Sequence, residues 1–177
     1  MTRPILVAVA ATMLLAAAPA VERPDFAARI LARHNAERVL VGMAPLKWDA
    51  KLAQGASVWA RHLAVTRTFD HSPDDSDADP QGENLWMGTS RAYSYEDMVD
   101  GWIEEKRDYR SGLFPKVTTT RDWSDVGHYT QLIWHSTTHV GCAVASGGGN
   151  DVLVCRYSPP GNWDGESPTG QAARRRR

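Results

Sequence analysis

The sequence contains little cysteine, and this limits the sites and scaffolds that the chain can build. Only two of its 177 residues are cysteines, Cys142 and Cys155. A zinc site of four thiolates is therefore excluded, as is a small scaffold held by several disulfides. The two cysteines lie in the β-like runs VGCAVA and DVLVCRYS, separated by SGGGN. A hairpin would bring them together, and in an oxidising compartment we expect them to form one disulfide.

Long apolar runs are absent after the first 20 residues. The chain begins with one basic residue, Arg3, followed by an apolar run that ends in the small-residue pattern Ala-Pro-Ala. This pattern predicts that residues 1–20 are a secretory signal peptide. The alternative, an uncleaved anchor, is less consistent with a run shorter than the ~20 residues that a span requires. We therefore expect a mature chain without a transmembrane span, secreted or periplasmic.

Positive charge is scarce in the body of the chain. With residues 1–20 and the arginines at 174–177 set aside, 15 Lys and Arg stand against 21 Asp and Glu, a net charge of −6. An acidic body argues against a nucleic-acid partner. No repeat or second hydrophobic unit is present, so we expect one domain at 22–166 and a disordered basic tail at 167–177.

Familiar catalytic motifs are also missing. The chain has no H-E-x-x-H and no G-x-S-x-G string, and the aspartates of SPDDSDADPQG at 72–82 lack the spacing of a calcium-binding loop. Each of these absences weakens the hypothesis of an enzyme.

Apolar periodicity predicts three helices. The first runs from Asp25 to about Val41 and places His34 and Arg38 on an apolar face, which indicates buried polar side chains. Asp49 can cap a second helix that ends near Thr66. Its expected buried stripe is Leu52, Ala56, Trp59 and Leu63.

The third predicted helix begins after a cap formed by Ser94 with Asp97 and extends to about Tyr109. It contains two adjacent glutamates. Helical periodicity turns Glu104 toward water and Glu105 toward the packed side. A carboxylate at the edge of a core needs a partner, so Glu105 becomes a candidate site residue.

Four strings resemble the CAP superfamily, which includes cysteine-rich secretory proteins, venom antigens and plant pathogenesis-related proteins. They are HNAER at 34–38, GENLW at 82–86, GHYTQLIW at 127–134 and VLVCRYSPPGNW at 152–163. The resemblance implies an α+β fold, a three-layer α-β-α sandwich with a short antiparallel sheet between helices. His34, Asn35 and Arg38 match the H-N-x-x-R string, which implies a structural role.

The resemblance also implies a central cleft in which two histidines and two glutamates meet. Matched string by string, these residues are His71 in FDHS, Glu83 in GENLW, Glu105 in WIEEK and His128 in GHYTQLIW. The two imidazoles can hold a divalent metal such as zinc, and the carboxylates can accept hydrogen bonds from their N–H groups. The alternative is a hydrogen-bond network that only holds the cleft together.

Three functions remain open. The first, which we favour, is a secreted binding module with a metal-binding cleft and a groove for a lipid or sterol, as the resemblance implies. The second is a metal-assisted hydrolase or peptidase that uses the same four residues. The third is an interaction protein of the cell envelope or of a host surface. The low cysteine content and the predicted signal peptide are typical of a bacterial exported member.

Overall fold

A mixed sheet between layers of helices organises the chain in the computed structural model, which describes residues 25–73 and 79–170. The predicted signal peptide and the residues 171–177 of the tail lie outside the described residues. The helical and strand elements are, in chain order, α1 (Phe26–Leu40), β1 (Lys47–Trp48), α2 (Ala50–Thr66), β2 (Gly82–Thr89), α3 (Tyr95–Ile103), η1 (Glu104–Arg107), η2 (Trp123–Val126), α4 (Gly127–Leu132), β3 (His139–Gly147) and β4 (Asn150–Ser158).

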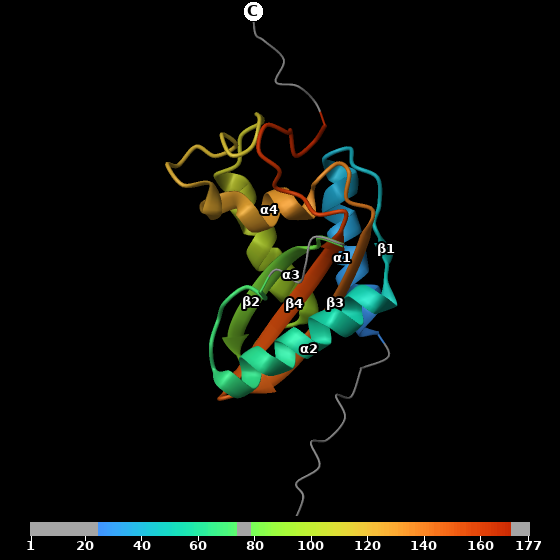
Figure 1. Ribbon diagram of the computed structural model, residues 1–177, viewed down its shortest axis with the longest axis vertical. Helices are drawn as coiled ribbons and strands as arrows, with labels where there is room; N and C mark the ends of the chain where they lie inside the picture. The colour runs from blue at the N-terminus through green and yellow to red at the C-terminus, as the bar shows by residue number, and fades with distance from the viewer. Residues whose placement is uncertain (1–24, 74–78, 171–177) are drawn as a thin grey trace, which may run out of the picture.

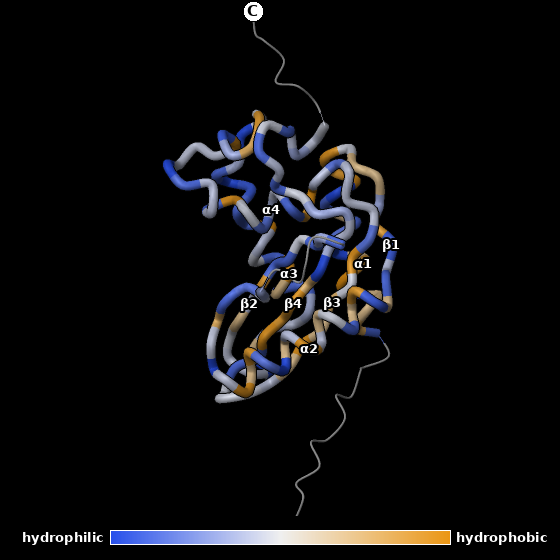
Figure 2. The backbone as a smooth tube through the Cα atoms, viewed as in Figure 1, coloured by the Kyte–Doolittle hydropathy of each residue, from blue (hydrophilic) through white to orange (hydrophobic). Residues whose placement is uncertain are grey.

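The three layers follow from the two faces of the sheet (Figure 1). Helix α2 lies across one face, where its alanines and Leu63 pack against residues of β2 and β4. Helices α1, α3 and α4 cover the other face around a larger core that includes Trp102. Hydrophobic residues are dense along the middle of β4, which is buried between the layers (Figure 2). The expected three-layer α-β-α sandwich is confirmed.

The sheet has the strand order β1-β3-β4-β2. Strands β2, β4 and β3 pair in antiparallel fashion, as expected. The short edge strand β1 differs, because it pairs with β3 in parallel. The chain arrives there from the far end of α1 and forms only a brief ladder, in which Lys47 N donates to Thr138 O and Asp49 N donates to Val140 O.

The β3–β4 hairpin confirms the disulfide. Its turn residues Gly148 and Gly149 have φ values of +61° and +89°, the left-handed geometry that a tight hairpin turn requires. The resulting register places Cys142 directly opposite Cys155, with Cα atoms 4.1 Å apart, and the two are disulfide-bonded. The structure describes no free cysteine in residues 25–73 and 79–170.

Helix α2 begins as predicted, since the side chain of Asp49 accepts hydrogen bonds from the backbone N–H groups of Lys51 and Leu52. The prediction that Trp59 belongs to its buried stripe is only partly right. The indole is half-buried, stacks on His62 and donates to the carbonyl of Asp70. Ala60 takes the fully buried position instead.

Helix α3 begins at the predicted capping box of Ser94 and Asp97 but ends earlier than expected. The α-helical part stops at Ile103 and the chain tightens into a 3-10 turn, η1. Tyr109, the expected last residue, instead forms a β-bridge with Thr118, which draws the chain out of the helix.

The polar residues of HNAER have the structural role that the resemblance implied. Arg38 and His34 are fully buried, but the guanidinium binds backbone carbonyls and does not pair with the imidazole. The carbonyls that accept from it are those of Ala44, Leu132, Trp134 and Thr137. Asn35 exchanges two hydrogen bonds with the backbone of Leu46. This helix thereby anchors two loops.

The packed chain continues past residue 166, the boundary expected from the sequence. Ser167 is buried, and the carbonyl of Pro168 accepts a hydrogen bond of 2.7 Å from the backbone N–H of His135. Residues 167–170 are therefore part of the domain. None of the helices in the described ranges has the length and hydrophobicity that a membrane crossing requires.

Gly141 allows α2 to approach the sheet. A Cβ atom at this position would lie 2.2 Å from the backbone nitrogen of Ala53 and 2.4 Å from the carbonyl oxygen of Asp49. Both are backbone atoms, which cannot relieve the overlap by a change of rotamer as a side chain can. We expect Gly141→Ala to lower the free energy of unfolding by about 2 kcal/mol. A urea midpoint equal to that of the wild type would contradict this close approach.

Candidate functional site

The first half of the site is a histidine–glutamate pair between α4 and η1. His128 is the second residue of α4, and its Nδ1 lies 2.6 Å from Oε1 of Glu105. The other oxygen, Oε2, accepts a hydrogen bond of 3.0 Å from the backbone N–H of Tyr129. A carboxylate accepts, so Nδ1 carries a proton, and in the neutral ring Nε2 then keeps its lone pair. The periodicity argument that turned Glu105 inward and Glu104 outward is confirmed.

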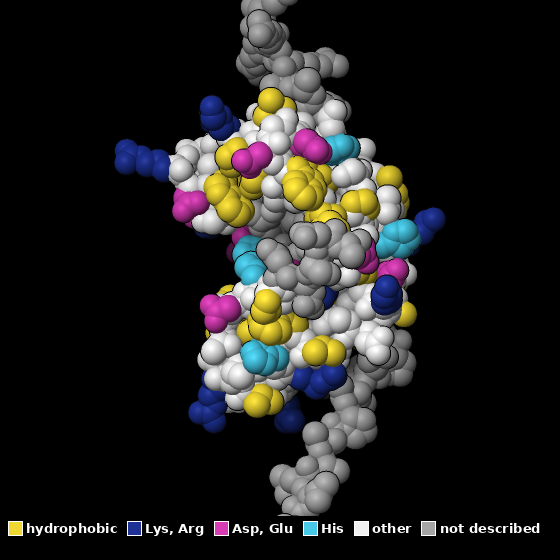
Figure 3. Space-filling model, viewed as in Figure 1, with side chains coloured by type: hydrophobic (Ala, Val, Ile, Leu, Met, Phe, Trp, Pro, Cys, Tyr) yellow, Lys and Arg dark blue, Asp and Glu magenta, His cyan; other side chains and the backbone are white. Residues whose placement is uncertain are grey.

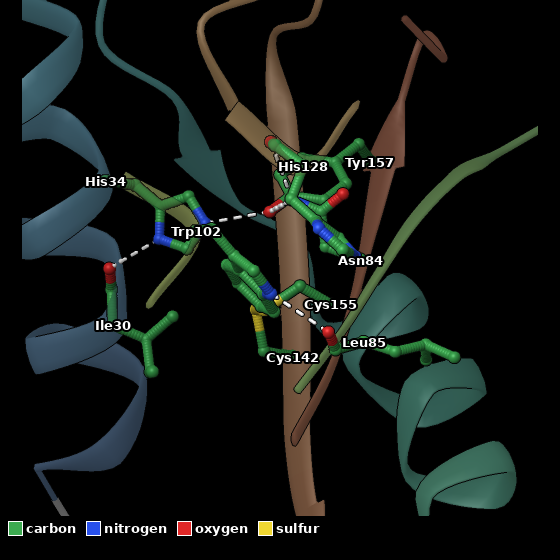
Figure 4. The surroundings of a disulfide bond; sticks show 9 residues. All are labelled: Ile30, His34, Asn84, Leu85, Trp102, His128, Cys142, Cys155 and Tyr157. Carbon is green, nitrogen blue, oxygen red and sulfur yellow. Dashed lines mark hydrogen bonds between the residues drawn. A yellow bond between two sulfur atoms is a disulfide. The ribbon is translucent and has the colours of Figure 1, made fainter. Parts of the chain in front are cut away.

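The indole ring of Trp102 stacks on the imidazole of His128. Its ring lies nearly parallel to that of His128, with centroids 6.2 Å apart and an interplanar angle of 18°. The indole N–H donates to the carbonyl of Leu85 in β2, which fixes the ring against the sheet near the disulfide (Figure 4). The stack restricts His128 to one orientation.

The second half is a histidine–glutamate pair at the beginning of β2. Nδ1 of His71 lies 2.9 Å from Oε1 of Glu83. Ser72 donates two hydrogen bonds to the same carboxylate. Its backbone N–H lies 3.0 Å from Oε1 and its hydroxyl lies 2.9 Å from Oε2. The guanidinium of Arg156, on the neighbouring strand β4, lies 3.6 Å from Oε2. The carboxylate of Glu83 is thus contacted by His71, Ser72 and Arg156.

Opposing influences set the pKa values of this second pair. Burial raises the pKa of Glu83, but the hydrogen bonds from His71 and Ser72 outweigh it and bring that pKa below its ordinary value. The hydrogen bond to Glu83 raises the pKa of His71, against the effect of burial. Glu83 is therefore a carboxylate at neutral pH.

Asn84 connects the two pairs. It follows Glu83 in β2, and successive strand side chains point to opposite faces. Its Nδ2 donates to the backbone carbonyl of His128 at 3.0 Å and to the hydroxyl of Tyr157 at 3.2 Å. The two histidine–glutamate pairs therefore lie on either side of the first residues of β2, and Figure 4 shows Asn84 and Tyr157 beside His128.

In both pairs the imidazole is more exposed than the carboxylate that it contacts. The side chains of His71 and Glu83 are 63% and 8% exposed, and those of His128 and Glu105 are 32% and 19% exposed. Figure 3 shows histidine side chains at an indentation on the left of the molecule, between its upper and lower parts.

The other histidines do not join this site. His34 is buried in the core, where it bonds to Ile30 and Tyr157. His62 and His135 are exposed, and His139 is half-buried. Within residues 25–73 and 79–170, no group of three or more His, Cys, Asp or Glu side chains is arranged to hold a metal. The described protein atoms could supply two imidazole ligands, and water would complete the coordination.

Sequence reasoning did not assign the supporting residues of the site, Ser72, Asn84, Arg156 and Tyr157. Asn84 and Tyr157 stand inside the GENLW and CRYSPPGNW strings, so a signal for them was present. Ser72 follows His71 in the sequence, but this adjacency does not predict that Ser72 donates hydrogen bonds to Glu83. The position of Arg156 follows only from strand register, which pairs it with Glu83.

Comparison with known proteins shows relatives that match most of this chain. A family model described as the cysteine-rich secretory protein family, CAP, matches residues 31–157. Pathogenesis-related protein 1A of Nicotiana tabacum is 37% identical over 136 residues, covering 76% of each chain. The pathogenesis-related PR-1 type protein of Sambucus nigra is 36% identical, covering 76% of this chain and 77% of its own length.

Solved structures share the fold. BmVAL-1 has a TM-score of 0.70 and 25% identity, covering 84% of this chain and 83% of that chain. NaASP2 with Zn²⁺ has a TM-score of 0.68 and 23% identity, covering 85% and 88%. The four strings, the sandwich and the matched region agree: the chain belongs to the CAP family of cysteine-rich secretory proteins.

Proposed function

We propose that this protein is a binding module whose cleft holds a divalent metal, zinc in the first place, through Nε2 of His71 and Nε2 of His128. One observation carries the proposal. The Nδ1 atom of each imidazole lies within hydrogen-bond distance of a carboxylate that is less exposed than the ring, Glu83 or Glu105, so that in the neutral ring Nε2 is left to bind a metal. This carboxylate–histidine arrangement is typical of metal-binding histidines, because it selects the tautomer and orients the ring.

The number of available ligands favours binding over catalysis. Catalytic zinc sites commonly use three protein ligands and one open position, whereas the described residues provide two imidazoles. The two carboxylates are already occupied by the rings and by backbone or serine N–H and O–H groups, so neither is a free general base. We therefore infer reversible metal binding without turnover.

The test is zinc titration by calorimetry at neutral pH on purified, metal-free protein. We expect the wild type to bind one zinc ion and the double variant His71→Ala with His128→Ala to bind none, because no described imidazole pair remains. The double variant should keep a thermal midpoint near that of the wild type, since both side chains are partly exposed.

The exposed His135 provides a matched control. His135→Ala removes an imidazole that has no partner at the site and should leave zinc uptake unchanged. Glu83→Gln and Glu105→Gln should each weaken zinc binding about 10- to 100-fold, as loss of a supporting carboxylate does. Undiminished zinc uptake by the double histidine variant would refute the proposed site.

The lipid ligand, the export and the bacterial origin of the protein stay predictions. The zinc ion of the NaASP2 structure is a property of that protein. Its 23% sequence identity to this chain indicates a common fold only. A lipid or sterol ligand is implied by the resemblance, and organic extraction of the purified protein followed by mass spectrometry tests it. Export and a bacterial origin likewise stay predictions, and the relatives named above are plant proteins.

A further inference from the structure

The outer side of α2 combines exposed apolar side chains with basic ones. Helical periodicity separates the side chains of α2 into two arcs. The buried arc consists of Leu52, Ala53, Ala56, Ala60, Leu63 and Ala64. The opposite arc, here called the outer α2 face, consists of Lys51, Gln54, Val58, Arg61, His62 and Val65.

Apolar side chains are exposed to solvent on this face. Val65 is 82% exposed and Val58 is 59% exposed. Phe69, just past the end of the helix, is 45% exposed. Val58 and Val65 lie two turns apart on the same stripe, and neither belongs to a described core cluster. Folding therefore leaves these apolar groups exposed.

The charges on this face are of one sign. Residues 50–69 contain no Asp or Glu, whereas Lys51, Arg61 and Arg67 are all exposed. The body of the chain carries a net charge of −6 by sequence, so this concentration of basic groups runs against its general charge. Figure 3 shows the lower part of the molecule, where α2 faces the viewer, with separate yellow patches bordered by dark blue side chains.

We propose that the outer α2 face docks on the surface of an anionic lipid bilayer. Valine and phenylalanine side chains can enter the boundary between headgroups and acyl chains while flanking Lys and Arg meet acidic headgroups. A helix that rests on a sheet presents a convex face, which suits a fluid planar surface better than a peptide that needs a groove. This docking is independent of the metal cleft.

Vesicle flotation of the full chain, in the presence of a chelator, tests the proposal. We expect the protein to float with vesicles of phosphatidylcholine mixed with phosphatidylglycerol and to stay behind with phosphatidylcholine alone. Raising the salt concentration should release it, because the attraction is screened. Failure to float would overturn the docking and leave the zinc proposal untouched.

Two variants address the face directly. Lys51→Glu with Arg61→Glu, and separately Val65→Glu, should each lower the partition coefficient at least about tenfold. All three positions are exposed, so folding should be preserved, and circular dichroism checks this. The matched control Arg110→Glu with Arg121→Glu makes the same change in net charge at exposed positions elsewhere and should float like the wild type.

Three results would overturn the proposal. Equal losses in the control pair would mean that net charge alone governs binding. Loss of flotation only when the arginines at 174–177 are replaced by serine would assign the binding to those residues. A wild-type dimer in light scattering that Val65→Glu converts to a monomer would assign the face to a second copy of the chain.

Discussion

Replacing Arg38 with methionine should lower the free energy of unfolding by about 4 kcal/mol. The side chain is fully buried, and its guanidinium donates to four backbone carbonyls at 2.7 to 3.1 Å. Three of these belong to the segment 132–137 that follows α4, and the fourth to the loop after α1. Methionine fills a similar volume but donates nothing, so the four carbonyls lose the hydrogen bonds of the guanidinium, and among the described residues only that of Trp134 keeps another backbone donor, the N–H of Thr137. Burial lowers the pKa of Arg38 to about 10, and the group remains charged at neutral pH.

Arg33 on the same helix is the control. It pairs with Asp100, and their side chains are 26% and 41% exposed. Solvent screens such a pair, so Arg33→Met should cost below about 1 kcal/mol. Chemical denaturation of both variants measures the difference. Equal losses would mean that the Arg38 carbonyl network does not stabilise the loops.

Acidification from pH 6.5 to pH 4 should remove roughly 3 kcal/mol of stability through His34 alone. Burial lowers the pKa of His34 from its ordinary 6.5 to about 4. Between these pH values the unfolded chain binds a proton that the folded chain does not, so stability rises with pH and falls on acidification.

The hydrogen bonds of His34 explain why its ring resists protonation. Nδ1 donates to the carbonyl of Ile30 at 2.8 Å, so Nε2 accepts from the hydroxyl of Tyr157 at 2.9 Å. That hydroxyl in turn accepts from Asn84. A second proton on His34 would face a hydroxyl hydrogen, and Tyr157 would lose its acceptor. The charge would also lie in a fully buried position.

The comparison of His34→Gln with the wild type isolates this group. Carboxylates also titrate in this range, so the quantity to measure is the difference between the pH–stability curves of the wild type and of His34→Gln. We expect the variant to lose about one proton of pH dependence between pH 6.5 and 4. Parallel curves for wild type and His34→Gln would contradict the assignment.

Periodicity and local chemistry accounted for most of the fold. The caps at Asp49 and Ser94, the hairpin turn and the disulfide all depend on neighbouring residues, and all were predictable. The parallel strand β1 was not, because Lys47 pairs with His139, which is distant in sequence. The early end of α3 and the half-buried ring of Trp59 were also missed, because they depend on contacts outside the helical pattern, with Thr118 for Tyr109 and with Asp70 and His62 for Trp59.

The candidate site was predicted in its four central residues, but its pairing was not. Helical period alone indicated the inward turn of Glu105, and the other three came from the resemblance. No pattern indicated that Glu83 would hold His71 while Glu105 holds His128, or that Asn84 would join the two pairs. Each of these contacts joins residues of different elements, which local spacing does not bring together.

By itself the sequence determined the first two helices, the beginning of the third, the disulfide partners and the acidic character of the body. Each of these depends on spacing within one segment. The tertiary structure alone decided which carboxylate meets which imidazole and which carbonyls Arg38 binds. Such contacts depend on how sheet register and layer packing bring remote segments within 3 Å of one another, and no local pattern encodes that distance.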